Sequence, residues 1–180
     1  MKRLPTDLPE LVLLELEAFH DARGSFTETF RKDRYREAGI AMDFVQDNLS
    51  SSVAGTLRGL HYRVDAPEGK LLQVVHGEIF DVAVDIRRSS PTFGRWFGTT
   101  LSAANRHQLW IPPGFAHGSY AVTAAVVAYK VTGYYTPGAD RALLWSDPRL
   151  GIAWPLRSGA PIVSAKDAAA PVLAAAELLP

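Results

Sequence analysis

Residues 71–88 read LLQVVHGEIFDVAVDIRR, and this stretch decides the fold class that the sequence predicts. Gly77 divides it into two apolar runs, each with the length of one strand. In the second run apolar residues alternate with Asp81, Ala83 and Asp85, a period of two that is typical of a strand with two different faces. The two aspartates therefore share one face, which is either a solvated outer surface or the inner wall of a binding site.

Turn residues recur at short intervals on both sides of this stretch. They separate further strand-like segments at SSPTFG (89–94), ANRHQLWIPPGFAHG (104–118) and TPGAD (136–140). This rhythm predicts an all-β protein built as an antiparallel sandwich or barrel, and not alternating βαβ units. Residues 31–39, RKDRYREAG, form the one good helical candidate in the first half, and the Ala-rich end (158–180) predicts a weakly helical tail.

The chain has 180 residues, 47% of them hydrophobic, which is enough for one substantial core. We therefore expect a single domain over residues 1–180, with a barrel core at about 40–155 on which the N-terminal strands and the C-terminal tail pack. The 19 basic and 19 acidic side chains cancel, so no global charge attracts nucleic acid or a membrane surface. The lack of cysteine excludes disulfides, thiolate nucleophiles and cysteine-ligated zinc. Proline and acidic residues break the N-terminal apolar runs, which predicts a cytoplasmic protein without a secretory signal.

The main chemical signal lies in residues 57–70, LRGLHYRVDAPEGK. This segment places Arg58, His61, Arg63 and Lys70 within fourteen residues. A histidine beside permanent cations is typical of a site that binds an anion and transfers a proton. The alternative is a solvated loop in which His61 only packs.

A closed antiparallel barrel brings polar side chains from several strands together at its mouth. Asp81, Asp85, His117 and Tyr129 could therefore meet His61 there, although a strand tyrosine can equally belong to the core. A histidine base, a phenol acid, and a lysine or arginine beside a developing oxyanion together suit deprotonation next to a carbonyl group. Neither a G-x-S-x-G elbow nor a phosphate-binding glycine motif occurs to indicate another reaction.

Two segments echo the metal-binding motifs of cupins. Gly55 stands six residues before His61, and residues 112–117 form a P-x-G-x-x-H core that ends at His117. Where the first motif has its second histidine, this chain has Arg63, a permanent cation that would repel a metal ion. We therefore predict no metal, and a metal-dependent cupin oxygenase or isomerase is the alternative.

Five strings of the sequence are long and specific enough to compare with known families. They are LRGLHYR (57–63), GKLLQVVHGEIFDVAVDIRRSSPTFGRW (69–96), LSAANRHQLWIPPGFAHG (101–118), YKVTGYYTP (129–137) and SAKDAAAP (164–171). Together they resemble the dTDP-4-dehydrorhamnose 3,5-epimerase family, over nearly the whole chain. The resemblance implies a cupin-type antiparallel jelly-roll barrel with a few short peripheral helices, a homodimer, and no metal or other cofactor. The implied substrate is a dTDP-linked 4-keto-6-deoxyhexose.

The resemblance also implies catalytic roles. His61 is the base that removes the C3 and C5 protons, and Tyr129 is the acid on the opposite face of the sugar. Lys70 lies beside the C4 ketone, where its charge stabilises the enolate. Asp167 orients His61, with Asp81 as a second candidate for that role.

A further set of residues is implied to hold the nucleotide sugar. Arg23 and Arg58 suit the diphosphate, and Tyr135, or the adjacent Tyr134, suits stacking on thymine. Asp140 stands where the family often has glutamate. The full implied set is Arg23, Glu28, Gln46, Asp47, Asn48, Arg58, Lys70, His117, Tyr135, Asp140 and Lys166.

Some positions depart from the family pattern. Arg63 replaces the usual glutamine and adds charge at the pocket, and Ser119 and Tyr120 follow FAHG where an aromatic residue is usual. The resemblance implies epimerisation at both C3 and C5, but reshaped pocket walls leave a mono-epimerase acting at C3 or C5 as an alternative. A non-catalytic, sugar-nucleotide-binding cupin is a second alternative.

Overall fold

The computed structural model describes residues 1–157 and 159–180, and Ser158, the first residue of the predicted tail, lies outside the described residues. Strands dominate the regular structure, and no helix in these ranges is long and apolar enough to cross a membrane. The helices are α1 (Lys32–Glu37), α2 (Ala165–Ala168) and the short 3-10 helix η1 (Leu173–Ala175). The strands are β1 (Lys2–Leu4), β2 (Val12–Glu15), β3 (Phe19–Asp21), β4 (Gly24–Phe26), β5 (Gln46–Ser52), β6 (Leu57–Arg63), β7 (Lys70–His76), β8 (Glu78–Asp85), β9 (Trp96–Ser102), β10 (His107–Ile111), β11 (Phe115–Ala121), β12 (Ala125–Val131) and β13 (Asp140–Ala142).

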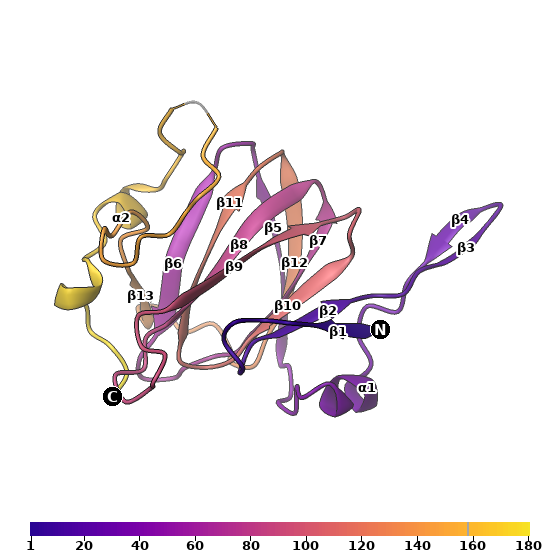
Figure 1. The fold of residues 1–180 in the computed structure, drawn as a ribbon, viewed down its shortest axis with the longest axis horizontal. Helices are drawn as coiled ribbons and strands as arrows, with labels where there is room; N and C mark the ends of the chain where they lie inside the picture. The colour runs from indigo at the N-terminus through magenta and orange to yellow at the C-terminus, as the bar shows by residue number, and fades with distance from the viewer. Residues whose placement is uncertain (158) are drawn as a thin grey trace.

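Two sheets form the body of the molecule (Figure 1). One has six strands in the order β1-β2-β10-β7-β12-β5, and the other has five in the order β13-β6-β11-β8-β9. Neighbouring strands within each sheet are antiparallel. The predicted all-β, antiparallel jelly-roll architecture is therefore confirmed. The helix predicted at 31–39 is α1, and Gly39 follows it with a φ of 100°, a conformation that glycine adopts without a steric cost.

The strand break predicted at Gly77 is confirmed, and it does more than end a strand. β7 belongs to the six-stranded sheet and β8 to the five-stranded sheet, so the chain changes sheets at this residue. Gly77 has a φ of 76°, and a Cβ atom there would lie 2.0 Å from the carbonyl oxygen of Ala124. The crossing therefore requires glycine at this position.

The alternation along β8 places its two aspartates inside the molecule. Ala83 packs in the core between the sheets, whereas Val82 and Val84 pack in a second core on the other face of the strand. Asp81 and Asp85 alternate in step with Ala83, and both are 0% exposed. Of the two readings of this face, the solvated outer surface is wrong.

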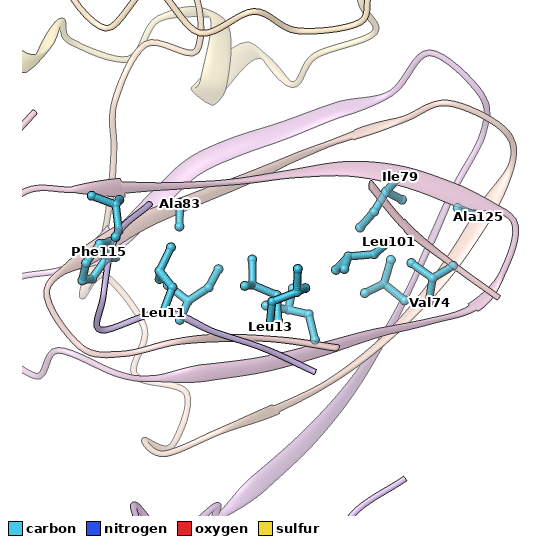
Figure 2. Close-up of a cluster of buried hydrophobic side chains, with 13 residues drawn as sticks. Leu11, Leu13, Val74, Ile79, Ala83, Leu101, Phe115 and Ala125 are labelled. Atoms are coloured by element: carbon cyan, nitrogen blue, oxygen red, sulfur yellow. The ribbon is translucent and has the colours of Figure 1, made fainter. Parts of the chain in front are cut away.

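The core between the two sheets draws on strands from the whole chain (Figure 2). Val74, Leu101 and Phe115 meet there with Leu11 and Leu13 from the N-terminal segment. The N-terminal residues reach this core because β2 pairs with β10 and so extends the six-stranded sheet. Burying each large aliphatic side chain contributes about 1.5–3 kcal/mol to stability, which holds the two sheets face to face.

A second core lies under the C-terminal tail. Leu60, Val82 and Ile86 point outward from the five-stranded sheet and pack against Leu173 and Leu178 of the tail. In Figure 1 the tail with α2 lies beside β6 and β13. This packing fixes α2 next to β6, and it brings a residue of the tail to the site described below.

Candidate active site

A cavity of about 230 Å³ lies between residues of both sheets. The five-stranded sheet contributes His61 from β6, and the six-stranded sheet contributes Lys70 from β7 and Tyr129 from β12. Strand alternation explains their orientation, because Leu72 on β7 and Val127 on β12 face the core between the sheets two residues away. The complete lining is Gln46, Asn48, His61, Tyr62, Arg63, Glu68, Lys70, Tyr129, Val131, Tyr135 and Asp140.

The imidazole of His61 contacts a buried carboxylate from the C-terminal tail. His61 Nε2 lies 2.7 Å from Asp167 Oδ1, and the backbone N–H of Gly59 donates to Asp167 Oδ2 at 3.2 Å. Ser164 caps α2 by accepting a hydrogen bond from the backbone N–H of Asp167, which fixes the carboxylate. If Nε2 donates its proton to this carboxylate, Nδ1 of the neutral ring is free to accept one.

Asp81, the second carboxylate predicted beside His61, lies elsewhere, and that expectation is wrong. Asp81 Oδ2 is 2.8 Å from Nε2 of His117 instead. The strand order gives the reason, because β11 lies between β6 and β8 and places His117 between the two. The cavity region thus holds two histidine–carboxylate pairs, with His61 and His117 opposite each other on neighbouring strands.

Burial lowers the pKa of His61 below its ordinary value. The hydrogen bond to Asp167 opposes this shift, and the positive charge of Lys70 adds to it, but desolvation dominates. His61 is therefore neutral near pH 7, in the form that accepts a proton. Its side chain is still 37% exposed, so a ligand in the cavity can reach it.

The ring of Tyr129 is half-buried and also packs against the core between the sheets. Burial raises the pKa of its phenol, and the negative charge of Glu68 raises it further. The phenol is therefore protonated near pH 7 and able to donate its proton. The core-packing and cavity-lining interpretations of Tyr129 are both correct.

Four charged side chains of alternating sign line one wall of the cavity. Lys70 Nζ lies 3.4 Å from Glu68 Oε1, and Arg63 Nη1 lies 2.8 Å from Glu68 Oε2. Arg63 Nε donates to Asp140 Oδ1 at 2.9 Å. Burial alone would raise the pKa of Asp140, but this hydrogen bond brings it below its ordinary value. Sequence reasoning missed Glu68, because it stands in a polar connection between β6 and β7 where a glutamate is ordinarily solvated, and nothing in the sequence shows that it pairs with Arg63.

Two further cavities share His61 with the first. One, of about 180 Å³, is bounded by Arg58, His117 and Ser119 together with His61, Lys70 and Tyr129. The other, of about 390 Å³, is bounded by Arg58, Lys166 and Asp167. A group of basic side chains around a neutral histidine suits a ligand that carries negative charge beside its reacting part.

The structure brings together most of the residues predicted to hold a nucleotide sugar, but not all of them. Tyr135 lines the cavity, and its backbone N–H donates to Gln46 Oε1 at 3.0 Å. Three of the predicted residues line none of the cavities around His61 and pair with their own neighbours instead. Arg23 pairs with Asp21 in the β3–β4 hairpin, Glu28 pairs with Arg34, and Asp47 pairs with Lys130.

In the described part of the chain, the possible metal ligands are not arranged around a common point. In residues 1–157 and 159–180, no group of three or more His, Asp or Glu side chains is arranged to hold an ion. His61 and His117 each direct Nε2 at a carboxylate, and Arg63, where cupins have a second histidine, is engaged with Glu68 and Asp140. The residues present do not fit a metal ion.

Comparison with known proteins gives consistent results. The family model described as dTDP-4-dehydrorhamnose 3,5-epimerase matches residues 5–175. A dTDP-4-dehydrorhamnose 3,5-epimerase of Neisseria gonorrhoeae is 52% identical over 98% of this chain, which spans 54% of that relative's length. A dTDP-6-deoxy-D-glucose-3,5-epimerase of Legionella pneumophila, solved with dTDP-4-keto-L-rhamnose, is 48% identical, with a TM-score of 0.94 and coverage of 98% of this chain and 94% of that one.

A solved structure of narrower described activity is also similar. It is a 3′-monoepimerase of Streptomyces bikiniensis, in complex with dTDP-quinovose, and it is 32% identical to this chain. Its TM-score is 0.87, and the match covers 97% of this chain and 88% of that one. The fold is therefore shared by proteins described as inverting two carbons and by one described as inverting one.

Proposed function

Because this chain belongs to the dTDP-4-dehydrorhamnose 3,5-epimerase family, we propose that it converts dTDP-4-dehydro-6-deoxy-D-glucose into dTDP-4-dehydro-L-rhamnose. The observation that carries the proposal is the placement of His61 and Tyr129 on opposite sheets around one cavity. A base and an acid on opposite sides of a sugar ring can remove a proton from one face and return one to the other.

The proposed reaction inverts one carbon at a time. His61 takes the C3 proton, and the electron pair of the C–H bond moves into an enolate whose oxygen, O4, faces the Lys70 ammonium group. Tyr129 then donates its proton to the opposite face of C3, and the C4 ketone forms again. The imidazolium loses its proton to solvent and the phenolate regains one, so the same groups can act at C5. No electrons are gained or lost overall.

In this scheme Lys70 stabilises the negative charge that develops on O4 of the enolate. A preorganised cation beside a developing oxyanion typically contributes about 2.7–4 kcal/mol to the transition state. Asp167 holds the ring of His61 and stabilises the imidazolium that forms. Arg58 and Lys166, which line a neighbouring cavity that shares His61, are the proposed ligands of the diphosphate, and Tyr135 is the proposed partner of thymine.

The proposal includes a homodimer, as the family resemblance implies. Arg23 and Glu28 lie outside the cavities around His61 in their own chain, so they can bind substrate only in another copy. The β3–β4 hairpin that carries Arg23 projects from the sheets (Figure 1), and its Phe19 and Phe26 are 59% and 70% exposed. Sedimentation equilibrium should give twice the chain mass, and a monomeric wild-type protein would refute this part.

The reaction is tested by incubating the ketosugar nucleotide with the protein in deuterated water. Deuterium should enter both C3 and C5, and mass spectrometry with NMR assigns it by position. Label at one carbon only would support the mono-epimerase, the alternative favoured by the substitutions at Arg63 and Ser119. Tight dTDP binding without deuterium in the sugar would support the non-catalytic, sugar-nucleotide-binding cupin. Stoichiometric, tight metal binding would support the metal-dependent cupin oxygenase or isomerase.

A further inference from the structure

Arg63 and Glu68 form an ion pair that is hidden from solvent. Their side chains are 7% and 8% exposed, although both belong to the strand end and connection that lead from β6 to β7. A buried ion pair of this kind adds little net stability, because desolvation of the two charges offsets their attraction. Stability of the fold therefore does not explain why these charges are placed here.

Glu68 divides its carboxylate between two cations. Oε2 faces Arg63 Nη1 at 2.8 Å, and Oε1 faces Lys70 Nζ at 3.4 Å. The contact with Arg63 is an ion pair without a well-aligned hydrogen bond, because Oε2 is buried and accepts none from the described residues. The Lys70 side chain is 16% exposed, and among the described residues Glu68 is the acidic group that pairs with it. The position of the ammonium group therefore depends on where Arg63 holds this carboxylate.

Arg63 has two more partners, Tyr134 and Asp140, and both follow β12 in the chain. Its Nη1 donates to the carbonyl oxygen of Tyr134 at 3.0 Å, and its Nε donates to Asp140. These contacts tie the β6–β7 connection to the segment between β12 and β13 that carries Tyr135. The Arg63 guanidinium group thus contacts both Glu68, which holds the Lys70 ammonium group, and the segment that carries Tyr135.

The geometry points to Arg63 and Glu68 as a positioning pair, which holds the Lys70 ammonium group where the substrate's ketone oxygen becomes negatively charged. This inference rests on the proposed function. The substrate ketone and its enolate differ little in shape and strongly in charge, so an exact position for the cation matters in the transition state more than in binding. Loss of the pair should therefore lower kcat more than it raises KM.

The pair also sets the electrostatic environment of the Tyr129 phenol. The charged groups facing this ring are Glu68 and Asp140, which raise its pKa, and Arg58 and Arg63, which lower it, while His61 and Lys70 line the same cavity. Replacing Glu68 by glutamine should therefore lower the pKa of the phenol, and replacing Arg63 should raise it. A purely structural role would not move the two variants in opposite directions.

The experiment compares Arg63→Gln, Glu68→Gln and the double variant R63Q/E68Q by steady-state kinetics and deuterium exchange over a pH series. Each single variant should lose on the order of 10- to 100-fold in kcat, the scale expected when a catalytic group is displaced by about 1 Å. The basic limb of the rate profile should move to lower pH in Glu68→Gln and to higher pH in Arg63→Gln. The double variant removes the whole pair, so its loss in kcat should be about that of the worse single variant and not the product of the two losses, because the two residues act through one contact with Lys70.

Arg141→Gln is the matched control. Arg141 follows Asp140 on β13, and it forms an ion pair of 2.7 Å with Glu177 at the surface, outside the cavities around His61. This variant should keep kcat, KM and the pH profile of the wild type. Thermal unfolding of every variant shows whether it is folded, and if Arg63→Gln does not fold, the isosteric Glu68→Gln decides the matter alone.

The possible failures are distinguishable. A wild-type protein that exchanges no deuterium overturns the proposed function, and the positioning role falls with it. A wild type that exchanges normally, with single variants of unchanged kcat and an unmoved basic limb, overturns the positioning role alone. Losses in the two single variants that simply multiply in R63Q/E68Q would also overturn it, because they would show that the two residues act independently.

Discussion

Asp81 and Asp85 stand four residues apart on β8, face the same way, and are both fully buried, yet their surroundings differ. Asp85 accepts hydrogen bonds from the Arg87 guanidinium, from Ser90 at 2.5 Å and from Thr92 at 2.6 Å. Asp81 contacts one imidazole, and its Oδ1 has no partner among the described residues. Buried polar groups in structural positions are almost always satisfied. The incomplete shell of Asp81 therefore distinguishes the functional end of the strand from the structural end.

The difference extends to the residues around each aspartate. The Asp85 end is closed by a short chain segment, residues 85–92, in which Arg87, Ser90 and Thr92 all donate to one carboxylate. At the other end, His61, His117 and Lys70 line cavities and keep bonding capacity free for a ligand. Changes at the two ends should therefore separate rate from stability.

The largest expected effect is on rate. His61→Asn should slow deuterium exchange by roughly 10²–10⁴-fold, the usual contribution of a general base, because asparagine cannot accept the proton. The unfolding midpoint in urea should stay close to that of the wild type, because asparagine can still donate to Asp167. Exchange at a near-normal rate would remove His61 from its proposed role.

The next largest effect is on stability. Asp85→Asn should lower the free energy of unfolding by about 1.5–3 kcal/mol, because it weakens the charged hydrogen bonds at Asp85 while Arg87, 27% exposed, keeps Glu10 as a partner at 3.0 Å. Urea denaturation measures this loss, and exchange per folded molecule should be unchanged. Asp81→Asn makes the same chemical change four residues away and should cost less stability, because a single imidazole contact is at stake. Equal losses in the two variants would contradict the contrast between the two ends.

The sequence predicted one part of this contrast and not the other. The period of two in residues 80–86 placed both aspartates on one face, but it did not show which face is interior. β8 is covered on both sides, by the opposite sheet and by the C-terminal tail, so hydrophobic alternation alone gives no direction. Gly77 could be predicted as a strand break because its requirement is local.

Site residues that a local segment reveals could be predicted from the sequence, and contacts between distant segments could not. His61 and Lys70 were singled out because they cluster with arginines in one short segment, and Tyr129 because a closed barrel brings its strands together at its mouth; their catalytic roles came from the family resemblance. Contacts across 106 residues, such as the one between His61 and Asp167, came from the resemblance alone. Glu68 was missed because a glutamate in a polar connection is ordinarily solvated, and only the folded chain shows that Arg63 is buried beside it.

A smaller loss of folding stability should appear when the pH is lowered. Burial alone would raise the pKa of Asp85, but its hydrogen bonds from Arg87, Ser90 and Thr92 bring it from 3.8 to about 2. A lowered carboxylate pKa stabilises the folded state above the unfolded value, and this stabilisation is lost as the pH falls from 3.8 through about 2. The loss should amount to about 2 kcal/mol in urea titrations. Asp85→Asn should remove this step, and its persistence in that variant would assign the step to another group.

The smallest effect concerns the acid limb of the rate profile, which reports on His61 of β6 in the cavity. Burial lowers the pKa of His61, and the protonated ring cannot accept a proton, so kcat/KM should fall with a midpoint below the ordinary value of 6.5. The Asp167 hydrogen bond opposes this shift, so Asp167→Asn should move the midpoint to still lower pH, whereas Asp85→Asn should leave it in place. Deuterium exchange measured between about pH 4.5 and 8 resolves these positions. A wild-type midpoint above 6.5 would mean that the carboxylate, and not desolvation, dominates the environment of His61.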